Sequence, residues 1–393
     1  MSSRILPEPE YDLCVAVNYY TPYVSGLTEV ARVVAEGLAE RGRRVAVVAC
    51  RHDPALPLTE RLNGVDIHRV PVVSTIGRGL VSPAFPVKVR EIARRSRVLH
   101  VHLPMLEAAA ITARSPVPVV STYHIDLWLP PGLINRAAIA VARRSAALAL
   151  RWSDAVVVNS EDQAEHSELW RVLRRTDRRA ISAPCIDRRG GSPRYRGSDG
   201  LHIGFLGRIV PDKGLPYLLA AFAAIDDPSA RLLIGGDYTT VAGGSVIDEI
   251  RAAASRDPRI RILGLLGGQE INDFYRSIDV FALPSVAESF GIAQAEAMMC
   301  GIPSVTTDLP GGRYPVRATG HGLIVPVGDP AALREALLEA AGWSPGRRAE
   351  GAARAHDLFG VEGCLDRYAA LFTDVAAAPG QTMIHDLESE RTA

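Results

Sequence analysis

The sequence predicts an α/β protein with two doubly wound domains that face each other across a cleft. Short apolar runs alternate with helical patterns in both halves of the chain, which is typical of parallel sheets covered by helices on both faces. The alternation stops at residues 188–200, which contain Gly, Ser and Pro without periodicity, and then starts again. The length of 393 residues suits two domains of about 150–200 residues, each with its own core.

The first half begins with a strand, a helix and a second strand. Apolar residues three and four positions apart predict the helix over 26–41. The expected strands of this half are 13–17, 44–49, 98–101, 117–120 and 155–158. We therefore assign residues 1–190 to an N-terminal domain.

The second half repeats the alternation, and we assign residues 201–365 to a C-terminal domain. Its expected strands are 203–206, 231–234, 260–263, 280–283 and 304–306. Its expected helices are 214–224, 246–255, 269–276, 290–300 and 330–341. The polar residues 377–393 are expected to form a disordered tail.

The helix expected over 290–300 has recognisable end signals. Ser289 is expected to cap its start, because a hydroxyl can accept a bond from an unpaired amide of the first turn. Gly301 suits the position after the last helical residue, and Pro303 prevents the helix from continuing.

Two glutamates flank the start of this helix. Glu288 is expected in the turn after strand 280–283, and Glu296 on the first turns of the helix. Unpaired amides and the positive end of the helix dipole would point between them. Such a site suits a sugar joined to a ribose through a diphosphate. The alternative is that these carboxylates only stabilise the helix start, and on spacing alone that alternative is the commoner one.

The loop after strand 203–206 carries two cations. Gly207 frees the backbone at the strand end, and Arg208 and Lys213 follow it, five residues apart. An arginine can hold a phosphate through two bonds, and a lysine adds a point charge. The alternative is that both cations serve only the loop, Lys213 as a cap and Arg208 beside a local acid.

The first half adds a glycine and a histidine at strand ends. Gly26 opens the helix after strand 13–17 and allows a ligand to approach the backbone closely. No G-x-G-x-x-G fingerprint is present near it, which disfavours a dinucleotide oxidoreductase. His124 follows strand 117–120 on the side of the expected cleft, with Asp126 nearby. His102 is a weaker candidate, and we interpret it as structural.

Metal and cofactor sites are not expected. Four aspartates are considered as metal ligands, and none of them belongs to an Asp-x-Asp pair at a strand end with further ligands nearby. They are Asp126, Asp154, Asp187 and Asp237. The five cysteines are scattered and lack metal spacing, which fits a reducing cytosol. There is no signal-peptide pattern at the start and no run of about 18 apolar residues, so we expect a cytoplasmic protein.

The charge of the chain is unevenly spread although its formal sum is zero. Residues 1–200 carry 28 Lys and Arg against 20 Asp and Glu, and residues 201–393 carry 16 against 24. A basic N-terminal half could meet a membrane surface or a phosphorylated acceptor. We favour solvated arginine-rich helices instead, and we expect no nucleic-acid partner.

Four arginines in the stretch 133–152 would share one helix face about 100° wide. They are Arg136, Arg143, Arg144 and Arg151. Such a face is typical of a helix lying on a membrane surface. An ordinary helix with one solvated side has the same pattern. The second explanation is favoured, and peripheral contact with the inner face of the membrane stays open.

Taken together, these motifs resemble those of retaining nucleotide-sugar glycosyltransferases of the GT-B fold, family 4. The resemblance covers residues 13–376. The Glu-x7-Glu motif of the family matches Glu288 and Glu296, and its Arg-x4-Lys pair matches Arg208 and Lys213. The histidine of its N-terminal domain matches His124.

The loop after the first strand departs from the family pattern at one position. The family usually has two glycines there, whereas this chain has Ser25 and Gly26. The resemblance also implies two Rossmann-like domains, with the acceptor on the N-terminal one, and a last helix at 366–376 that crosses back to it.

The resemblance implies a role for each site residue. Arg208 and Lys213 would hold the donor diphosphate and stabilise it as it leaves. Glu296 would bind the ribose, Glu288 the transferred sugar, and His124 would contact the sugar on the reacting face. Further backbone amides near the sugar and phosphates would come from Phe290, Gly291 and Ile292, and Gly26 would lie against the donor.

The implied reaction is the attack of an acceptor hydroxyl at the anomeric carbon with retention, without a metal and without a side-chain nucleophile. A UDP-sugar is the expected donor. The acceptor stays open between a glycolipid or polysaccharide precursor and a small natural product such as an aminocyclitol. Two alternatives to transfer are a non-catalytic GT-B subunit that binds nucleotide sugars and a sugar-nucleotide epimerase.

Overall fold

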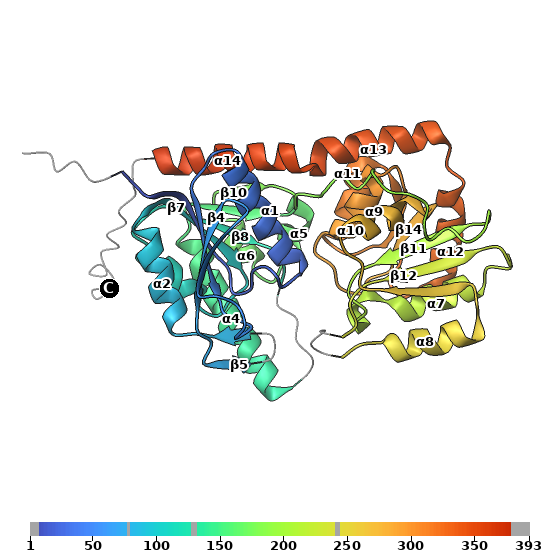
Figure 1. The fold of residues 1–393 in the computed structure, drawn as a ribbon, viewed down its shortest axis with the longest axis horizontal. Helices are drawn as coiled ribbons and strands as arrows, with labels where there is room; N and C mark the ends of the chain where they lie inside the picture. The colour runs from blue at the N-terminus through green and yellow to red at the C-terminus, as the bar shows by residue number, and fades with distance from the viewer. Residues whose placement is uncertain (1–7, 77–78, 127–131, 240–243, 379–393) are drawn as a thin grey trace, which may run out of the picture.

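The computed structural model describes residues 8–76, 79–126, 132–239 and 244–378. The tail expected over 377–393 falls outside these ranges from residue 379 onward. Within the described ranges the chain forms two α/β halves, and two long helices at the C-terminal end run along both of them (Figure 1).

The first half is built on a sheet with the strand order β10-β9-β8-β7-β1-β2-β4-β3, parallel except for β3 against β4. The strands are β1 (Tyr11–Ala16), β2 (Val45–Cys50), β3 (Thr59–Leu62), β4 (Val65–Val70), β7 (Ser96–Leu103), β8 (Val119–Tyr123), β9 (Ala155–Val158) and β10 (Arg178–Ala180). The helices are α1 (Gly26–Glu40), α2 (Ala84–Ala93), α3 (Ala108–Thr112), α4 (Leu133–Arg151), α5 (Glu161–Glu165) and α6 (Trp170–Leu173). A separate hairpin pairs β5 (Ser74–Ile76) with β6 (Gly79–Val81).

The second half is built on a fully parallel sheet with the order β13-β12-β11-β14-β15-β16. The strands are β11 (His202–Leu206), β12 (Arg231–Gly235), β13 (Ile260–Gly264), β14 (Val280–Leu283), β15 (Ser304–Thr307) and β16 (Gly322–Val325). The helices are α7 (Leu215–Ala223), α8 (Ile247–Arg256), α9 (Gln269–Arg276), α10 (Ile292–Met299), α11 (Tyr314–Thr319) and α12 (Pro330–Ala341). The predicted fold class, α/β with two doubly wound halves, is confirmed.

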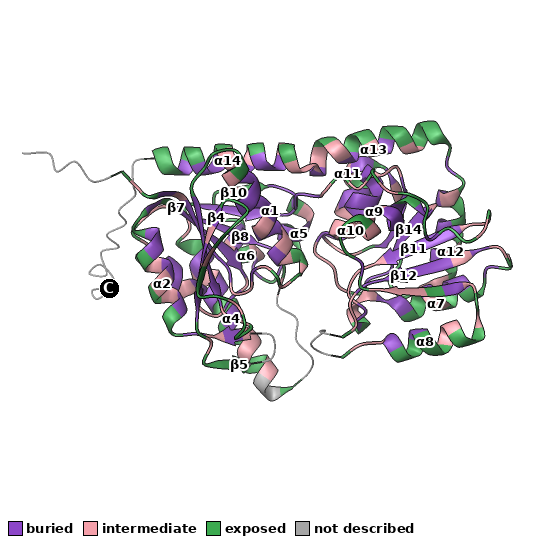
Figure 2. Ribbon diagram, viewed as in Figure 1, coloured by how far each residue is buried: buried purple, intermediate pink, exposed green. Residues whose placement is uncertain are grey.

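The residues of each central strand alternate between two cores. Leu13 and Val15 of β1 pack with α1 and α14, whereas Cys14 and Ala16 face the helices α2 to α4. Burial is concentrated in the sheets and on the inward faces of the helices (Figure 2). Because the order of the strands reverses beside β1 and beside β11, a ligand is expected at the carboxyl ends of these strands.

The helices α13 (Pro345–Phe359) and α14 (Val361–Ala377) return the chain from the second half to the first. Gly37 of α1 makes this crossing possible, since a Cβ there would overlap the side chain of Leu365. Arg41 donates hydrogen bonds to Asp366, at 2.8 Å, and to Glu362. The helix expected at 366–376 is thus part of α14, which begins at Val361, and the limits given for the two domains stay predictions.

Several elements differ from the expectation. The strands β3 and β4, the β5–β6 hairpin, α2, β10, β16 and α13 had not been expected. Strand β3 reads Thr-Glu-Arg-Leu and is largely exposed, so it lacks the apolar pattern that marks a buried strand. The segment 188–200 is irregular but not a free linker, because Tyr195 is buried and its amide donates to Ser277 Oγ at 3.0 Å.

None of the described helices is both long enough and apolar enough to cross a membrane. All four arginines of the α4 face are exposed. Arg143 pairs with Glu168 at 3.0 Å across the surface. Exposure is compatible with a solvated helix and with a membrane-facing one, so membrane contact stays a prediction.

Candidate functional site

Two loops meet at the point where the strand order of the second sheet reverses. The loop after β11 contains a short 3-10 turn, Pro211–Lys213, and the loop after β14 contains Glu288. The amide of Val286 donates to the Asp212 carbonyl at 2.9 Å. Gly214 has φ +66°, and a Cβ there would overlap the Pro284 carbonyl oxygen. The backbone therefore fixes the two loops against each other.

Lys213 and Glu288 form an ion pair at this junction. Lys213 Nζ lies 2.8 Å from Glu288 Oε2, and the two side chains are 15% and 12% exposed. The amide of Ser289 donates to Glu288 Oε1 at 3.0 Å. Burial raises the pKa of Glu288, but Lys213 and the amides of Ser289 and Phe290 outweigh it, so the pKa lies below its usual range. Glu288 is thus an ionised carboxylate paired with a cation.

Arg208 lies in the first of these two loops, directly after Gly207. The amides on either side of it are held, Gly207 by the Gly235 carbonyl at 3.1 Å and Ile209 by the Asp237 carbonyl at 2.8 Å. The side chain is half-buried, and the described part of the chain shows no hydrogen bond or ion pair to it. The local acid considered as an alternative partner is therefore not observed.

Helix α10 begins at Ile292, with Gly291 as its cap. Gly291 has φ +81°, and a Cβ there would lie 2.6 Å from Gln294 Nε2 and 2.7 Å from Leu283 Cδ2. The prediction that Ser289 caps this helix is wrong, because the turn requires a left-handed residue two positions later and the Ser289 amide serves Glu288. The first-turn amides of Ile292 and Ala293 have no partner within the helix, whereas that of Gln294 donates to the Gly291 carbonyl at 3.1 Å.

The end of α10 follows the prediction. Gly301 has φ +79° and follows the last helical turn. Its amide donates to the Met298 carbonyl at 2.9 Å, and the Ile302 amide donates to the Ala297 carbonyl at 3.0 Å. These two bonds form a Schellman motif, which confirms the expected place of Gly301.

Glu296 lies on the second turn of α10 and is buried. Its Oε1 accepts from Arg188 Nε at 3.2 Å, and its Oε2 accepts from the Tyr275 hydroxyl at 3.1 Å. Burial raises the pKa of Glu296, and Arg188 and Tyr275 counter this only in part. Neither partner of Glu296 was predicted from the sequence. Arg188 falls in an irregular segment, and no local pattern relates it to position 296.

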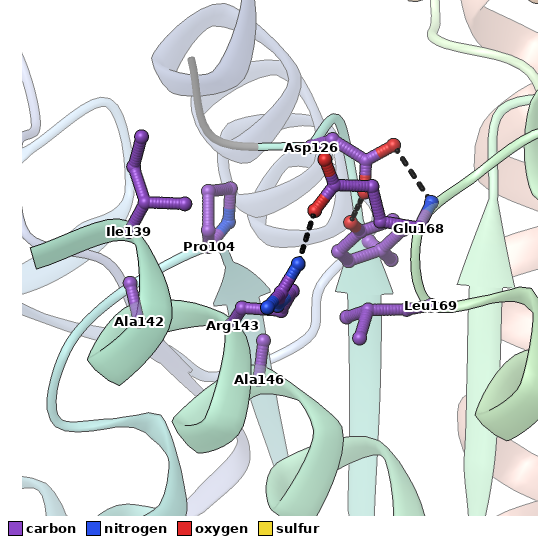
Figure 3. A pocket seen from close by; sticks show the side chains of 9 residues that line it. Pro104, Asp126, Ile139, Ala142, Arg143, Ala146, Glu168 and Leu169 are labelled. Carbon is purple, nitrogen blue, oxygen red and sulfur yellow. Dashed lines mark hydrogen bonds and ion pairs between the residues drawn. The ribbon is translucent and has the colours of Figure 1, made fainter. Parts of the chain in front are cut away.

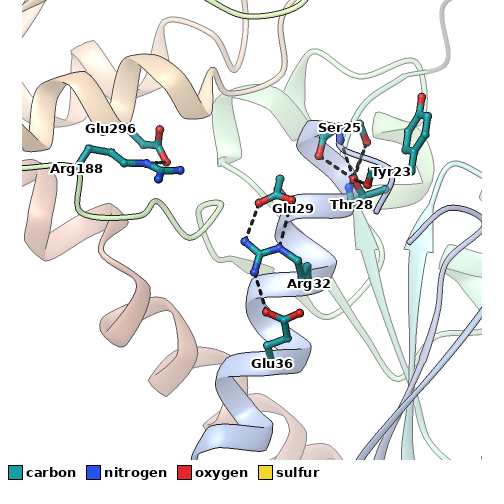
Figure 4. A network of polar contacts seen from close by, with 8 residues as sticks. All are labelled: Tyr23, Ser25, Thr28, Glu29, Arg32, Glu36, Arg188 and Glu296. Atoms are coloured by element: carbon teal, nitrogen blue, oxygen red, sulfur yellow. Dashed lines mark hydrogen bonds and ion pairs between the residues drawn. The ribbon is translucent and has the colours of Figure 1, made fainter. Parts of the chain in front are cut away.

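The N-terminus of α1 approaches the N-terminus of α10. Ser25 caps α1 by accepting from the Thr28 amide at 3.3 Å, while its own amide donates to Thr28 Oγ1 at 2.8 Å. A Cβ on Gly26 would lie 3.9 Å from Ile292 Cδ1, so these helix starts meet across the two halves. Figure 4 shows the capping residues of α1 in the same view as Arg188 and Glu296. Ser25, which replaces a family glycine, thus has a structural role.

His124 lies at the end of β8 and is 4% exposed. Its Nε2 lies 2.8 Å from His102 Nδ1. Burial lowers the pKa of His124 to about 3, so the ring is neutral at neutral pH. Asp126 does not contact it, since that carboxylate accepts from the Tyr123 hydroxyl and from Ser167 Oγ at 2.9 Å.

Asp126 belongs to a different place in the first half. It lines a small pocket together with Pro104, Arg143, Glu168 and Leu169 (Figure 3). The expected neighbourhood of His124 and Asp126 is therefore a neighbourhood in sequence only.

Another ion pair, between Asp162 and Arg313, joins the two halves close to Glu288. Asp162 of α5 accepts from Arg313 Nε at 2.9 Å and from its second guanidinium nitrogen at 2.7 Å, and the Gly311 amide adds a bond at 3.2 Å. A Cβ on Gly312 would lie 3.0 Å from Glu288 Cβ. Burial raises the pKa of Asp162, but these bonds lower it below its usual range. This Asp162–Arg313 contact between the two halves, here called the clamp, was not predicted from the sequence.

The structure thus brings together part of the predicted site. Lys213 and Glu288 are in contact, and Gly26 lies close to Ile292. Arg208, Glu296 and His124 make no direct contact with that pair among the described residues. Phe290 contributes its amide to Glu288, while its ring is buried in the core.

Known proteins similar to this chain agree with the architecture. Residues 25–183 match a family model described as "Glycosyl transferase 4-like domain", and residues 200–342 match one described as "Glycosyl transferases group 1". The phosphatidyl-myo-inositol mannosyltransferase of Mycobacterium leprae is 30% identical over 333 residues, which cover 78% of this chain and 80% of that relative. The chain belongs to glycosyltransferase family 4.

Two further comparisons extend the picture of this family 4 glycosyltransferase. The GDP-mannose-dependent alpha-mannosyltransferase of Mycobacterium tuberculosis is 28% identical over 342 residues, covering 81% of this chain and 84% of that relative. The sucrose-phosphate synthase of Thermosynechococcus elongatus superposes with a TM-score of 0.77 at 20% identity, covering 93% of this chain and 99% of that one. This likeness concerns the fold, and it confirms the predicted GT-B architecture.

Proposed function

We propose that this glycosyltransferase moves a sugar from a nucleotide diphosphate sugar to an acceptor hydroxyl, with retention at the anomeric carbon. The observation that carries the proposal is the Lys213–Glu288 pair at the reversal of the strand order. Arg208 lies in the same loop as Lys213, and the described residues give its side chain no partner. Two cations and one carboxylate at the carboxyl edge of one sheet suit a diphosphate attached to a sugar, since the cations can bind phosphate and the carboxylate can bind hydroxyls.

The donor diphosphate would lie between Arg208 and Lys213. A guanidinium can bind two phosphate oxygens at once, and the ammonium of Lys213 would exchange Glu288 for phosphate. The amides of Gly291 and Ile292 at the start of α10 would add bonds and a favourable dipole. Glu288, released from Lys213, would accept hydrogen bonds from hydroxyls of the transferred sugar.

Glu296 would bind the ribose of the donor. Its carboxylate accepts from Arg188, from Tyr275 and from the Ile186 backbone amide, and a carboxylate has about four acceptor positions, so one is left for a hydroxyl. Arg188 and Tyr275 would hold the carboxylate in one orientation. The side chain is 7% exposed, so donor entry requires a small movement of the surrounding residues.

Transfer would depend on positioning and charge rather than on a protein nucleophile. The acceptor hydroxyl would attack on the face that the diphosphate leaves, and the leaving phosphate would take its proton. Arg208 and Lys213 would stabilise the negative charge that develops on the diphosphate. His124 would contact the sugar from the first half and help to align it.

The donor base and the acceptor are proposed only by class. The sequence favours a UDP-sugar, whereas the names of two relatives contain mannosyl transfer and, in one case, GDP-mannose. The name of the first relative also contains an inositol lipid, which is compatible with a glycolipid or cyclitol acceptor. Thermal shift with UDP- and GDP-sugars would identify the donor.

Variants of Arg208 test the proposal directly. With the donor so identified, Arg208→Ala should reduce nucleoside diphosphate release by at least about 100-fold, because a charge-stabilising group is lost from the leaving group. Arg276→Ala is the matched control, since Arg276 is an exposed arginine of the same half. Full turnover by Arg208→Ala would refute its role.

Product analysis separates the alternatives. Incubation with donor alone should yield slow release of free sugar. A nucleotide sugar with inverted ring stereochemistry would indicate an epimerase, and no chemical change with any donor or acceptor would indicate a binding subunit.

A further inference from the structure

Three buried histidines lie side by side beneath the carboxyl edge of the first sheet. His100 and His102 are two residues apart on β7 and therefore share one face, and His124 follows the neighbouring strand β8. The rings of His102 and His124 are nearly parallel, at an interplanar angle of 14°, with His102 Nδ1 2.8 Å from His124 Nε2. The ring centroids of His100 and His102 are 4.2 Å apart.

The ring of His102 has a polar partner on one side only. His102 Nε2 is buried and unpartnered in the described part of the chain. Burial lowers the pKa of His102 well below its usual range, and His100 and His124 lower it further, so the ring carries a single proton. That proton is on either Nδ1 or Nε2.

The two placements of the proton differ in what they leave unsatisfied. If His124 donated from Nε2, the proton of His102 would be on its own Nε2, as a buried N–H without an acceptor. If His102 donates from Nδ1, only a lone pair is left unpartnered. Orphaned buried N–H groups are rarer in proteins than under-satisfied acceptors. The same preference, applied to the imidazole ring, points to His102 as the donor, with the proton of His124 on Nδ1.

The ring of His100, which packs against His102, is itself held by its neighbours. Tyr368 and Phe372 of α14 pack against the His100 ring, with centroid distances of 5.8 Å and 5.1 Å. His100 Nε2 lies 2.7 Å from Thr122 Oγ1, and Thr122 is also hydrogen-bonded to Tyr368. The crossing helix α14 thus supports the histidine row from behind.

The backbone of His124 is fixed as well. Its amide donates to the Leu103 carbonyl at 3.1 Å, and its carbonyl accepts from Asn159 Nδ2 at 3.3 Å and from Gln163 Nε2. No bond to His124 Nδ1 appears in the described part of the chain, and that atom is not among the buried unpartnered ones. Nδ1 is therefore the ring atom of His124 that the described residues leave for a ligand.

We propose that His102 is a positioning residue that fixes His124 in the tautomer with its proton on Nδ1, so that an N–H is presented to an oxygen of the donor or the acceptor. The contribution of this N–H to transfer rests on the proposed function. The tautomer itself does not, and it can be measured without any substrate.

Histidine-selective ¹⁵N labelling and long-range ¹H–¹⁵N correlation of the full chain test the tautomer. The His124 signals are assigned as those lost in His124→Asn. The expected result is a protonated Nδ1 and an unprotonated Nε2 on His124. The reverse pattern in the wild-type protein would overturn the proposal.

Two variants of His102 test its part. His102→Asn keeps an N–H donor close to the position of Nδ1, and His102→Leu removes it. We expect His102→Leu to move the His124 proton at least partly to Nε2 and to lower kcat about 10–100-fold with a smaller change in KM, as when a residue that orients a catalytic group is lost. We expect His102→Asn to preserve the tautomer and most of kcat.

His321→Leu is the matched control, since His321 is likewise a fully buried histidine and lies in the other half. It should leave the His124 tautomer and kcat unchanged. An unchanged tautomer in His102→Leu would overturn the proposal. A changed tautomer with full kcat would support the positioning by His102 and refute the role of His124 in transfer.

Discussion

Lys213 Nζ lies 2.8 Å from Glu288 Oε2, and this is the one ion pair that either side chain forms within the described residues. The two residues are 75 positions apart in the chain and come from loops after adjacent strands. The two charges neutralise each other where both side chains are mostly buried. A bound nucleotide sugar would replace this bond with two others, phosphate on the lysine and sugar hydroxyl on the glutamate.

A double-mutant cycle measures the strength of this pair. Lys213→Met and Glu288→Gln should each lower the free energy of unfolding, because each leaves a mostly buried charge unpaired. The double variant should be more stable than the sum of the two losses predicts, with a coupling of about 1–3 kcal/mol. Urea unfolding provides the free energies.

The exposed pair Arg61–Asp66 provides the control cycle, since its side chains are 70% and 30% exposed. Its coupling should be about 0–1 kcal/mol because solvent screens the charges. Equal couplings in the two cycles would mean that the Lys213–Glu288 contact is not protected from water.

The two glutamates of the site should respond oppositely to pH. The folded protein lowers the pKa of Glu288, so its stabilising contribution is present above the unfolded pKa of about 4.3 and is lost as pH falls through the folded value. The pKa of Glu296 is raised, so its contribution is largest below about 4.3 and is lost as pH rises through the folded value.

Unfolding of the glutamine variants between about pH 4 and pH 7 separates these effects. The stability advantage of the wild type over Glu288→Gln should shrink as pH falls. Its advantage over Glu296→Gln should shrink as pH rises. The same pH slope for both variants would contradict the opposite environments of the two carboxylates.

The clamp between Asp162 and Arg313 should hold the halves together. Asp162→Asn removes a charge-assisted bidentate contact, so we expect a larger radius of gyration by small-angle scattering and a several-fold higher KM for the donor. Asp308→Asn is the control, because Asp308 bonds the same arginine at 2.9 Å but lies in the same half. If both variants gave the same radius as the wild type, the clamp would not set the arrangement of the halves.

Gly37 should be required for the docking of α14 on α1. A valine there would overlap Leu365, so Gly37→Val should destabilise the protein by about 1–3 kcal/mol, as overpacking does. Adding Leu365→Ala should restore part of the loss. The control is Gly346→Ala, at a helical glycine with no atoms near the added methyl, and it should change the stability little. Thermal unfolding measures the stability of Gly37→Val, of the double variant and of Gly346→Ala.

Some buried elements could be predicted from sequence because their signal is local, although β4 and α2 were not. The strands 155–158 and 280–283 are fully buried apolar runs, and the structure gives them the predicted limits. The helices 269–276 and 330–341 also have the predicted limits. Polar exposed elements such as β3 carry no such signal and were missed.

The site was only partly predictable for a related reason. Glu288, Lys213 and Gly26 stand at strand ends, which periodicity locates. Arg188 reaches Glu296 across 108 positions and Arg313 reaches Asp162 across 151, and no local pattern encodes such contacts. His102 was interpreted as structural. Its contact with His124, which follows the neighbouring strand, can be inferred only when the register of β7 and β8 is known.

The central claim is that Lys213 exchanges Glu288 for a donor phosphate. Isothermal titration of the purified chain with UDP and GDP tests it without knowledge of the acceptor, using Lys213→Met and the control Arg276→Ala. We predict that one of the two nucleotides binds the wild type and Arg276→Ala alike, and that Lys213→Met binds it at least about 10-fold more weakly, a loss of about 1.4 kcal/mol. Equal affinity of Lys213→Met and the wild type, or no binding of either nucleotide to the wild type, would contradict the account.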